Sequence, residues 1–376
     1  MNRPMPRLVL PRSDFHTLML ALGAAGYTVI GPRVAQGAIV YDRIDRVEDL
    51  PIGWTDEQAP GVYRLHRRED EALFGYAVGQ KSWKSYLYPP RSTLFTVTRT
   101  DGSWQFAPGE VAEVRYAMLG VRACELAAIA VQDRVFLGPG HPDRIYQTFR
   151  RDLFTIGVNC GVAGGTCFCV SMETGPRCES GYDLVLTELI DWWRHEFVLE
   201  AGSEAGEAIL GQLPGRPATD QDLVRVDEVV ERTSSTMGRS MNTDGIKQLL
   251  YDNLEHPRWD EVADRCLACT NCTLVCPTCF CATVEDSVTL DGAEATRTRR
   301  WDSCFSLDFS SLHGVPVRES RKARYRQWMT HKLATWYDQF GSSGCVGCGR
   351  CITWCPVGID ITEEVAAIRS NQKVVT

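Results

Sequence analysis

The sequence predicts an α+β protein in which a mixed α/β domain over residues 1–235 precedes a mainly helical domain over residues 244–376. In the first part, short apolar runs alternate with helix-like stretches, which is the pattern of a βαβ unit. In the second part, one cysteine pattern occurs twice, and a helix-like stretch over 317–340 lies between the two copies. At 376 residues the chain is long enough for two domains.

Local patterns predict the elements of the first domain in order. Apolar residues spaced three and four apart over 15–22 indicate a helix, with Ser13 as its N-cap and Gly26 as its end. Strand-like runs follow at 27–30, 38–41, 62–65 and 94–98. Strands at 114–119 and 153–158 then alternate with helices at 124–133 and 145–150. Two more strands (184–186, 197–199), a connection (202–218), a helix (220–231) and a linker (233–243) complete the domain.

The repeated cysteine pattern carries the strongest chemical signal. Each copy has the spacing C-x2-C-x2-C-x3-C-P, and the copies begin at Cys266 and Cys345, 79 residues apart. This spacing is the signature of bacterial-type proteins with two [4Fe–4S] clusters, in which the fourth cysteine of each run binds the other cluster. The first cluster would use Cys266, Cys269, Cys272 and Cys355, and the second Cys345, Cys348, Cys351 and Cys276. The long separation favours the larger helical ferredoxin type over the small β-rich type.

Two other interpretations of these cysteines are weaker. A pair of zinc sites is one alternative, but zinc sites draw on pairs of cysteines, whereas these runs contain triplets. Cys272, Cys276 and Cys279 also have the C-x3-C-x2-C spacing of radical-SAM enzymes. That match overlaps a complete ferredoxin run and includes Pro277, which follows the crossing ligand.

A third cluster is a further hypothesis, with ligands Cys124, Cys160, Cys167 and Cys169. Cys124 and Cys160 each follow a predicted strand, and ligands of open α/β sheets bind where parallel strands end. The alternative is a set of buried thiols, since free cysteine is commonly buried. The glycine-rich segment 161–165 lacks the GxGxxG spacing of a nucleotide site. Cys178 is a spare thiol, and Cys279, Cys281 and Cys304 stay unassigned, either as ligands of another metal or as residues lining a cluster.

Composition narrows the class of protein. The chain has 44% hydrophobic and 23% charged residues, as an ordinary globular protein does, and a net charge of −8 argues against nucleic acid as the main partner. It contains no apolar run long enough to span a bilayer and no secretory signal, so its 16 cysteines indicate a reducing cytoplasm. A basic stretch over 297–332 would raise cluster potentials or dock an acidic redox partner. No residue pattern indicates a nucleophile or a general base.

Several motifs together resemble a known family. In the second domain they are CLACTNCTLVCPTCFC, RWDSC, RESRKARYRQWMTHKL and CVGCGRCITWCPVGIDI, and in the first they are GVRACELAAI and GVNCGVAGGTCFCVSMETGP. They resemble the β subunit of cytoplasmic NiFe hydrogenases of the sulfhydrogenase type, a family that includes the A subunit of anaerobic sulfite reductase. The resemblance covers most of residues 80–376.

The resemblance implies an electron-transfer subunit that has no chemistry of its own. Such a subunit exchanges electrons with a flavin subunit that binds NAD(P)H and with the small and large subunits of a NiFe hydrogenase. A siroheme subunit of sulfite reductase is the alternative partner, and nothing in this sequence separates the two. Two interpretations from other classes stay open: a self-standing oxidoreductase with its own flavin, and a protein whose clusters only stabilise the fold.

Overall fold

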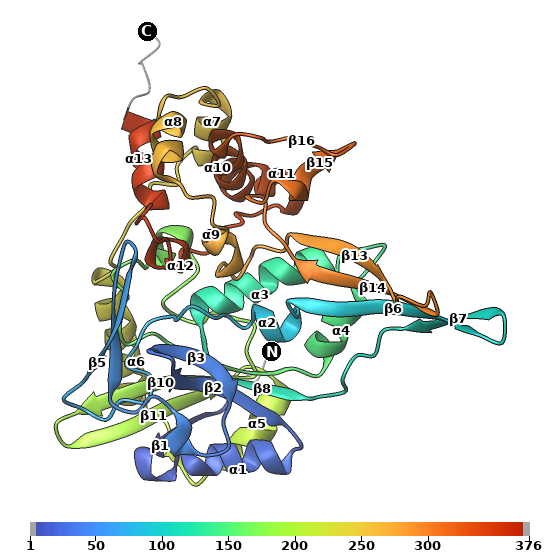
Figure 1. The fold of residues 1–376 in the computed structure, drawn as a ribbon. Coiled ribbons are helices and arrows are strands. Elements are labelled where there is room, and N and C mark those ends of the chain that lie inside the picture. Colours follow the sequence, from blue (N-terminus) through green and yellow to red (C-terminus); the bar gives the residue numbers. More distant parts are fainter. Residues whose placement is uncertain (1–4, 371–376) are drawn as a thin grey trace.

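The structure is a computed structural model and describes residues 5–370 (Figure 1). Its first part is built on a sheet of eight strands, four of which are parallel at the centre. The strand order is β12 (Arg216–Pro217), β1 (Arg7–Pro11), β11 (Arg194–Ala201), β10 (Leu184–Asp191), β9 (Phe154–Val158), β8 (Tyr116–Arg122), β2 (Thr28–Ala35) and β3 (Ala38–Arg43).

Helices cover both faces of this sheet because its strands are apolar on both sides. Helices α1 (His16–Ala24) and α5 (Glu204–Leu210) pack on the face that carries Leu10. Helix α6 (Asp220–Ser235) packs on the opposite face, where Val9 lies against Val226. Helix α3 (Ala123–Phe136) covers the neighbouring strands, and α4 (Arg144–Arg151) follows it. The α+β class is therefore confirmed, as is the βαβ unit, since β8 and β9 are parallel.

Three local predictions are corrected. Helix α1 begins at His16 after a 3-10 turn over Arg12–Asp14, so Ser13 lies inside that turn and does not cap the helix. The segment 202–218 contains α5 and β12, because Ser203 caps a helix by accepting a hydrogen bond from the Gly206 N–H. The 220–231 helix continues to Ser235, into the predicted linker.

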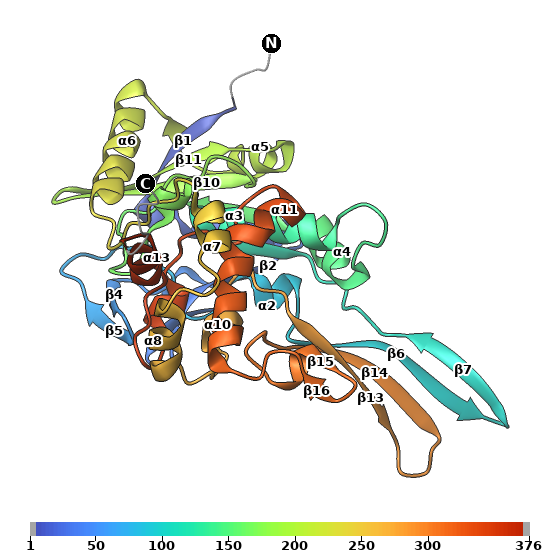
Figure 2. The same ribbon diagram turned by 90° about the horizontal axis from the view of Figure 1, so that it is seen from above.

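A second sheet joins strands from both predicted domains. Its order is β13 (Ala282–Val288), β14 (Glu294–Trp301), β6 (Arg91–Thr100) and β7 (Ser103–Pro108), all antiparallel. It extends from the body as an arm (Figure 2). The β4 (Trp54–Ala59) and β5 (Val62–Arg67) hairpin also reaches the second domain, where the Gly61 N–H donates to the Ile352 carbonyl at 3.1 Å. These contacts tie the two parts of the chain together.

The second part is mainly helical and lies beside one face of the first (Figure 1). Its helices are α7 (Ile246–Asp252), α8 (Arg258–Arg265), α9 (Asn271–Leu274), α10 (Arg321–Thr330), a π-helical turn (His331–Thr335), α11 (Trp336–Phe340), α12 (Arg350–Thr353) and α13 (Ile361–Ser370). Trp259, Trp328, Met329 and Leu333 form its core together with several cysteines. The short helix α2 (Lys84–Leu87), the β15–β16 hairpin (Ser311–Leu312, Val315–Pro316) and 3-10 turns at Val47–Asp49, Cys169–Met172 and Asp308–Ser310 complete the fold.

Candidate iron–sulfur site

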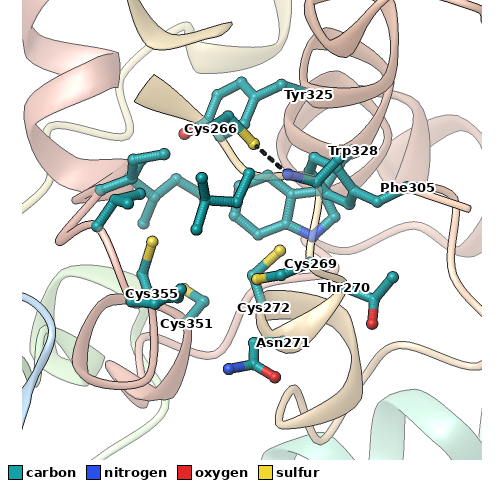
Figure 3. A pocket seen from close by; sticks show the side chains of 16 residues that line it. Cys266, Cys269, Thr270, Asn271, Cys272, Phe305, Tyr325, Trp328, Cys351 and Cys355 are labelled. Atoms are coloured by element: carbon teal, nitrogen blue, oxygen red, sulfur yellow. Dashed lines mark hydrogen bonds between the residues drawn. The ribbon is translucent and has the colours of Figure 1, made fainter. Parts of the chain in front are cut away.

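The first predicted set of cysteines gathers around one pocket (Figure 3). Three of its members come from the loop between α8 and the end of α9, and the fourth follows α12; they are Cys266, Cys269, Cys272 and Cys355. Phe305, Tyr325 and Trp328 form the apolar wall. The Ala268 N–H donates to the Cys266 sulfur at 3.4 Å, a bond of the kind that tunes cluster potentials. Cys269 is the exposed member, so this set borders the surface.

The second set is more deeply buried. Burial, then the sulfurs of Cys345, Cys348 and Cys276 and finally Cys272 of the first set, hold the pKa of the Cys351 thiol well above its usual value, and Cys351 also lines the pocket of the first set, so the two sets adjoin at this residue. Lys332, on the π-helical turn, donates to the Cys276 sulfur at 3.2 Å and to the Gly344 carbonyl at 3.1 Å. Burial disfavours its charge, but the neighbouring thiolates outweigh burial and hold the pKa of Lys332 well above its ordinary value.

The chemistry of the donors fits an iron–sulfur cluster in both sets. Burial raises the pKa of Cys272 and that of Cys345 to about 12, whereas the hydrogen bond from Cys279 and the charge of Lys332 lower the pKa of Cys276. A cationic iron core favours the thiolate form and replaces the protons. Within residues 5–370, no group of three or more His, Cys, Asp or Glu side chains is arranged to hold a single metal ion. A cluster places several irons between its ligands, so its sulfurs stand farther apart than around one ion.

A buried ion pair links the second set to the first domain. Arg350 follows Cys348 by two residues, and its guanidinium forms a short ion pair with Glu125 on α3, both side chains being 1% exposed. Arg350 also donates to the Gly79 carbonyl at 2.7 Å. Glu125 accepts from the hydroxyl of Tyr41 at 2.8 Å and from the indole of Trp83 at 3.2 Å. The positive charge of Arg350 therefore lies beside Cys348, and its Nη1 has no hydrogen-bond partner among residues 5–370.

The third predicted set also gathers in one place. Cys124 is the second residue of α3, and Cys160 lies two residues beyond β9, so the carboxyl ends of two adjacent parallel strands carry them. Burial, followed by the charges of Cys160, Cys167 and Cys348, raises the pKa of Cys169 above its usual range. Burial and then Cys169 do the same for Cys124.

The third set directly adjoins the second. Gly347 has φ +63°, and a Cβ at this position would lie 2.6 Å from the Cys169 Cα, so only glycine allows the two loops to approach so closely. The Phe168 N–H donates to the Gly347 carbonyl at 2.8 Å. Cys124, Cys169 and Cys348 pack in one small apolar cluster. The three cysteine sets thus form a continuous series from the sheet to the surface near Cys269.

Two buried lysines were missed as site residues by sequence analysis. Lys84 donates to the carbonyls of Leu274, Cys276 and Cys279 and lies 4.0 Å from the Trp301 ring centroid. Burial lowers the pKa of Lys84 to about 8. Lys332 was one member of a basic stretch, with nothing in its spacing to single it out. In the sequence, the only hint of Lys84 is its place among the aromatic residues of segment 82–91.

The rest of the basic stretch divides by position. Arg321 donates to the Cys266 carbonyl at 3.0 Å and so stays near the first set. Arg297 and Arg300 lie on the arm and pair with Asp286 and Glu285, away from the cysteines. Only part of the stretch can therefore act on cluster potentials.

Comparison with known proteins agrees with this geometry. Residues 265–359 match a family model described as a 4Fe-4S dicluster domain. The chain is 30% identical over 292 residues to the sulfhydrogenase 2 subunit beta of Pyrococcus furiosus, an alignment that covers 76% of this chain and 84% of that protein. No solved structure matches.

The fold and the cysteine sites define an iron–sulfur protein of the electron-transfer class. The chain belongs to the family of sulfhydrogenase beta subunits, which confirms the resemblance seen in its motifs. Within residues 5–370, no helix is both long and apolar enough to cross a membrane.

Proposed function

We propose that this chain relays electrons between a flavin subunit that oxidises or reduces NAD(P)H and the small and large subunits of a NiFe hydrogenase. Two [4Fe–4S] clusters are its core, the first held by Cys266, Cys269, Cys272 and Cys355 and the second by Cys345, Cys348, Cys351 and Cys276. Cys124, Cys160, Cys167 and Cys169 hold a third. Each cluster supplies one-electron transfer when bound, and the relay itself needs no catalytic residue of this chain. We assign it to the cytoplasm.

The observation that carries the proposal is the contact between the cysteine loops. Helix α9, which carries Cys272 of the first set, contacts helix α12, which carries Cys351 of the second set. Gly347 brings the second set against Cys169 of the third set. Electron tunnelling requires such closeness, whereas a cluster that only stabilises the fold does not. The charges of Lys332 and Arg350 beside Cys276 and Cys348 favour the reduced state, as a relay requires.

The test is anaerobic purification of the native complex through a tag on this chain, followed by metal and cofactor analysis. We expect nickel, FAD on a separate polypeptide, and more than twelve irons per copy of this chain, because its three clusters would account for about twelve and the NiFe site adds its own. Siroheme without nickel would contradict the hydrogenase assignment and support the sulfite reductase alternative. A lone chain with bound flavin would contradict both.

The third cluster has its own test in the Cys160→Ser variant. It should lose about four irons per chain, because the other eight predicted ligands are intact. Cys178→Ser is the matched control: Cys178 is buried beside β9, where its sulfur lies under Gly157, but it is outside the proposed ligand set. Equal iron in both variants and the parent, at about eight per chain, would refute the third cluster.

A further inference from the structure

Cys281 and Cys304 form a close pair at the base of the arm. Cys281 directly precedes β13 and Cys304 follows β14, so the pairing of these two strands brings the cysteines together. The Asp302 N–H donates to the Cys281 carbonyl at 2.9 Å and fixes the base of the hairpin. The two thiols lie close enough that Cys304 lowers the pKa of Cys281 while Cys281 raises that of Cys304.

The pair lines a cavity that opens to the surface. Other residues of its wall include His331, Gln327 and Arg318, and both cysteines are half-buried. Arg318 donates to the Ser310 hydroxyl at 2.9 Å, and among residues 5–370 it has no carboxylate within ion-pair distance. Asp143 also lines the cavity, but it is paired with Arg299. The guanidinium of Arg318 is therefore a positive charge in the cavity wall that no described carboxylate neutralises, and it would attract a small anion.

The pair also lies beside both ferredoxin cysteine sets. The Cys281 sulfur and then burial raise the pKa of Cys304, and the charge of Cys272 from the first set adds to this. Lys332 donates both to the Cys279 sulfur at 3.5 Å and to the Cys276 sulfur of the second set at 3.2 Å. The hydrogen bond from Cys304, then the charges of Lys332 and Lys84, lower the pKa of Cys281 to about 7. Thiolates with nearby cations are the reactive members of redox-active cysteine pairs.

We propose that Cys281 and Cys304 are a redox-active dithiol that reduces small anionic disulfides entering this cavity and is itself reduced by the two neighbouring clusters. The reduction step rests on the two ferredoxin clusters of the proposed function; the dithiol exchange does not.

The electrons balance in two half-reactions. The Cys281 thiolate attacks one sulfur of the bound disulfide, which breaks the S–S bond, forms a mixed disulfide and releases one thiolate. Cys304 gives its proton to the released thiolate, attacks the Cys281 sulfur, releases the second thiolate and closes an intramolecular disulfide. Two reduced clusters each return one electron, and one proton from solvent restores the Cys304 thiol beside the Cys281 thiolate. The pair thus converts two one-electron carriers into one two-electron reductant.

The experiment uses the cluster-loaded full chain under anaerobic conditions, with oxidised glutathione as the probe. Reduced, desalted protein is mixed with the probe, alkylated and mapped by mass spectrometry. We expect a Cys281–Cys304 disulfide and, in Cys304→Ser, a glutathione adduct trapped on Cys281. Adding dithionite should remove the disulfide while the clusters pass through their reduced state. Cys178→Ser is the control and should behave as the parent.

Two results would overturn the proposal. One is the loss of iron in Cys281→Ser or Cys304→Ser, which would make these residues cluster ligands. The other is a disulfide that involves Cys279 or no disulfide at all. A chain that forms the Cys281–Cys304 disulfide but co-purifies with siroheme contradicts only the hydrogenase assignment, whereas a nickel complex without this disulfide contradicts only the dithiol.

Discussion

Replacement of Lys332 by methionine should make the second cluster harder to reduce. The Lys332 ammonium donates to the Cys276 sulfur at 3.2 Å and is 3% exposed, so little water screens its charge. A reduced cluster carries one more negative charge than an oxidised one, and the ammonium stabilises that charge. Methionine fills a similar volume without the charge.

The size of the effect follows from Coulomb's law. With the ammonium about 6 Å from the centre of the cluster charge and an effective dielectric constant of about 20, the interaction is about 3 kcal/mol. For a one-electron couple this corresponds to about 120 mV. The potential of the second cluster should therefore fall by about 100 mV, while that of the first changes less because its sulfurs lie farther from the ammonium.

The assay is a redox titration followed by electron paramagnetic resonance, with iron content measured first to show that both clusters are loaded. Lys332→Arg retains the charge and should stay near the parent potential. Lys322→Met is the matched control, because Lys322 lies on the neighbouring helix α10 and pairs with Asp260 at 2.9 Å on the outer surface. A Lys332→Met potential within about 30 mV of the parent, or above it, would refute this electrostatic account.

Two further changes test what holds the site together. Glu125→Gln leaves Arg350 buried without its counter-charge, so the free energy of unfolding should fall by about 3–5 kcal/mol in a denaturant titration of the loaded chain. The control Asp286→Asn, on the exposed arm, should leave the free energy of unfolding unchanged. The hydrogen bonds and charge of Arg216 hold the pKa of Asp222 well below its usual range. This carboxylate therefore stabilises the fold above about pH 4, and its contribution is lost as the pH falls below that value. Asp222→Asn should therefore flatten the acid side of the stability profile, and an unchanged profile would contradict that role.

The cysteine sets could be predicted because their information is local. Spacing within ten residues specifies a ligand loop, and a run of β-branched residues before Cys160 indicates a strand. The strands that carry Cys124 and Cys160 were recognised for the same reason, although β8 begins at Tyr116 and ends at Arg122, later than its apolar pattern indicated. Which residue completes each cluster could be inferred only from the known crossing pattern of the repeated run.

The surrounding charges could not be predicted, because their partners are distant in sequence. Glu125 and Arg350 are 225 positions apart, and Lys84 reaches carbonyls about 190 residues away. The pairing of β6 with β14 could not be predicted for the same reason, because nothing in the local sequence indicates that Phe95 lies opposite Arg297. A sequence pattern of period two or 3.6 shows that a face is apolar, but it does not say which other face covers it.

In the proposed relay, these distant contacts would make the second cluster easier to reduce. Burial penalises the extra charge of a reduced cluster, so the set that lies deepest would be the hardest to reduce. Lys332 at Cys276 and Arg350 at Cys348 oppose that penalty from two sides. Arg350 depends on the first domain, since Glu125 neutralises it, and Lys84 of that domain adds a further cation that donates to the Cys276 carbonyl. In the proposed relay, the α/β domain therefore contributes charges that favour reduction of the buried second cluster.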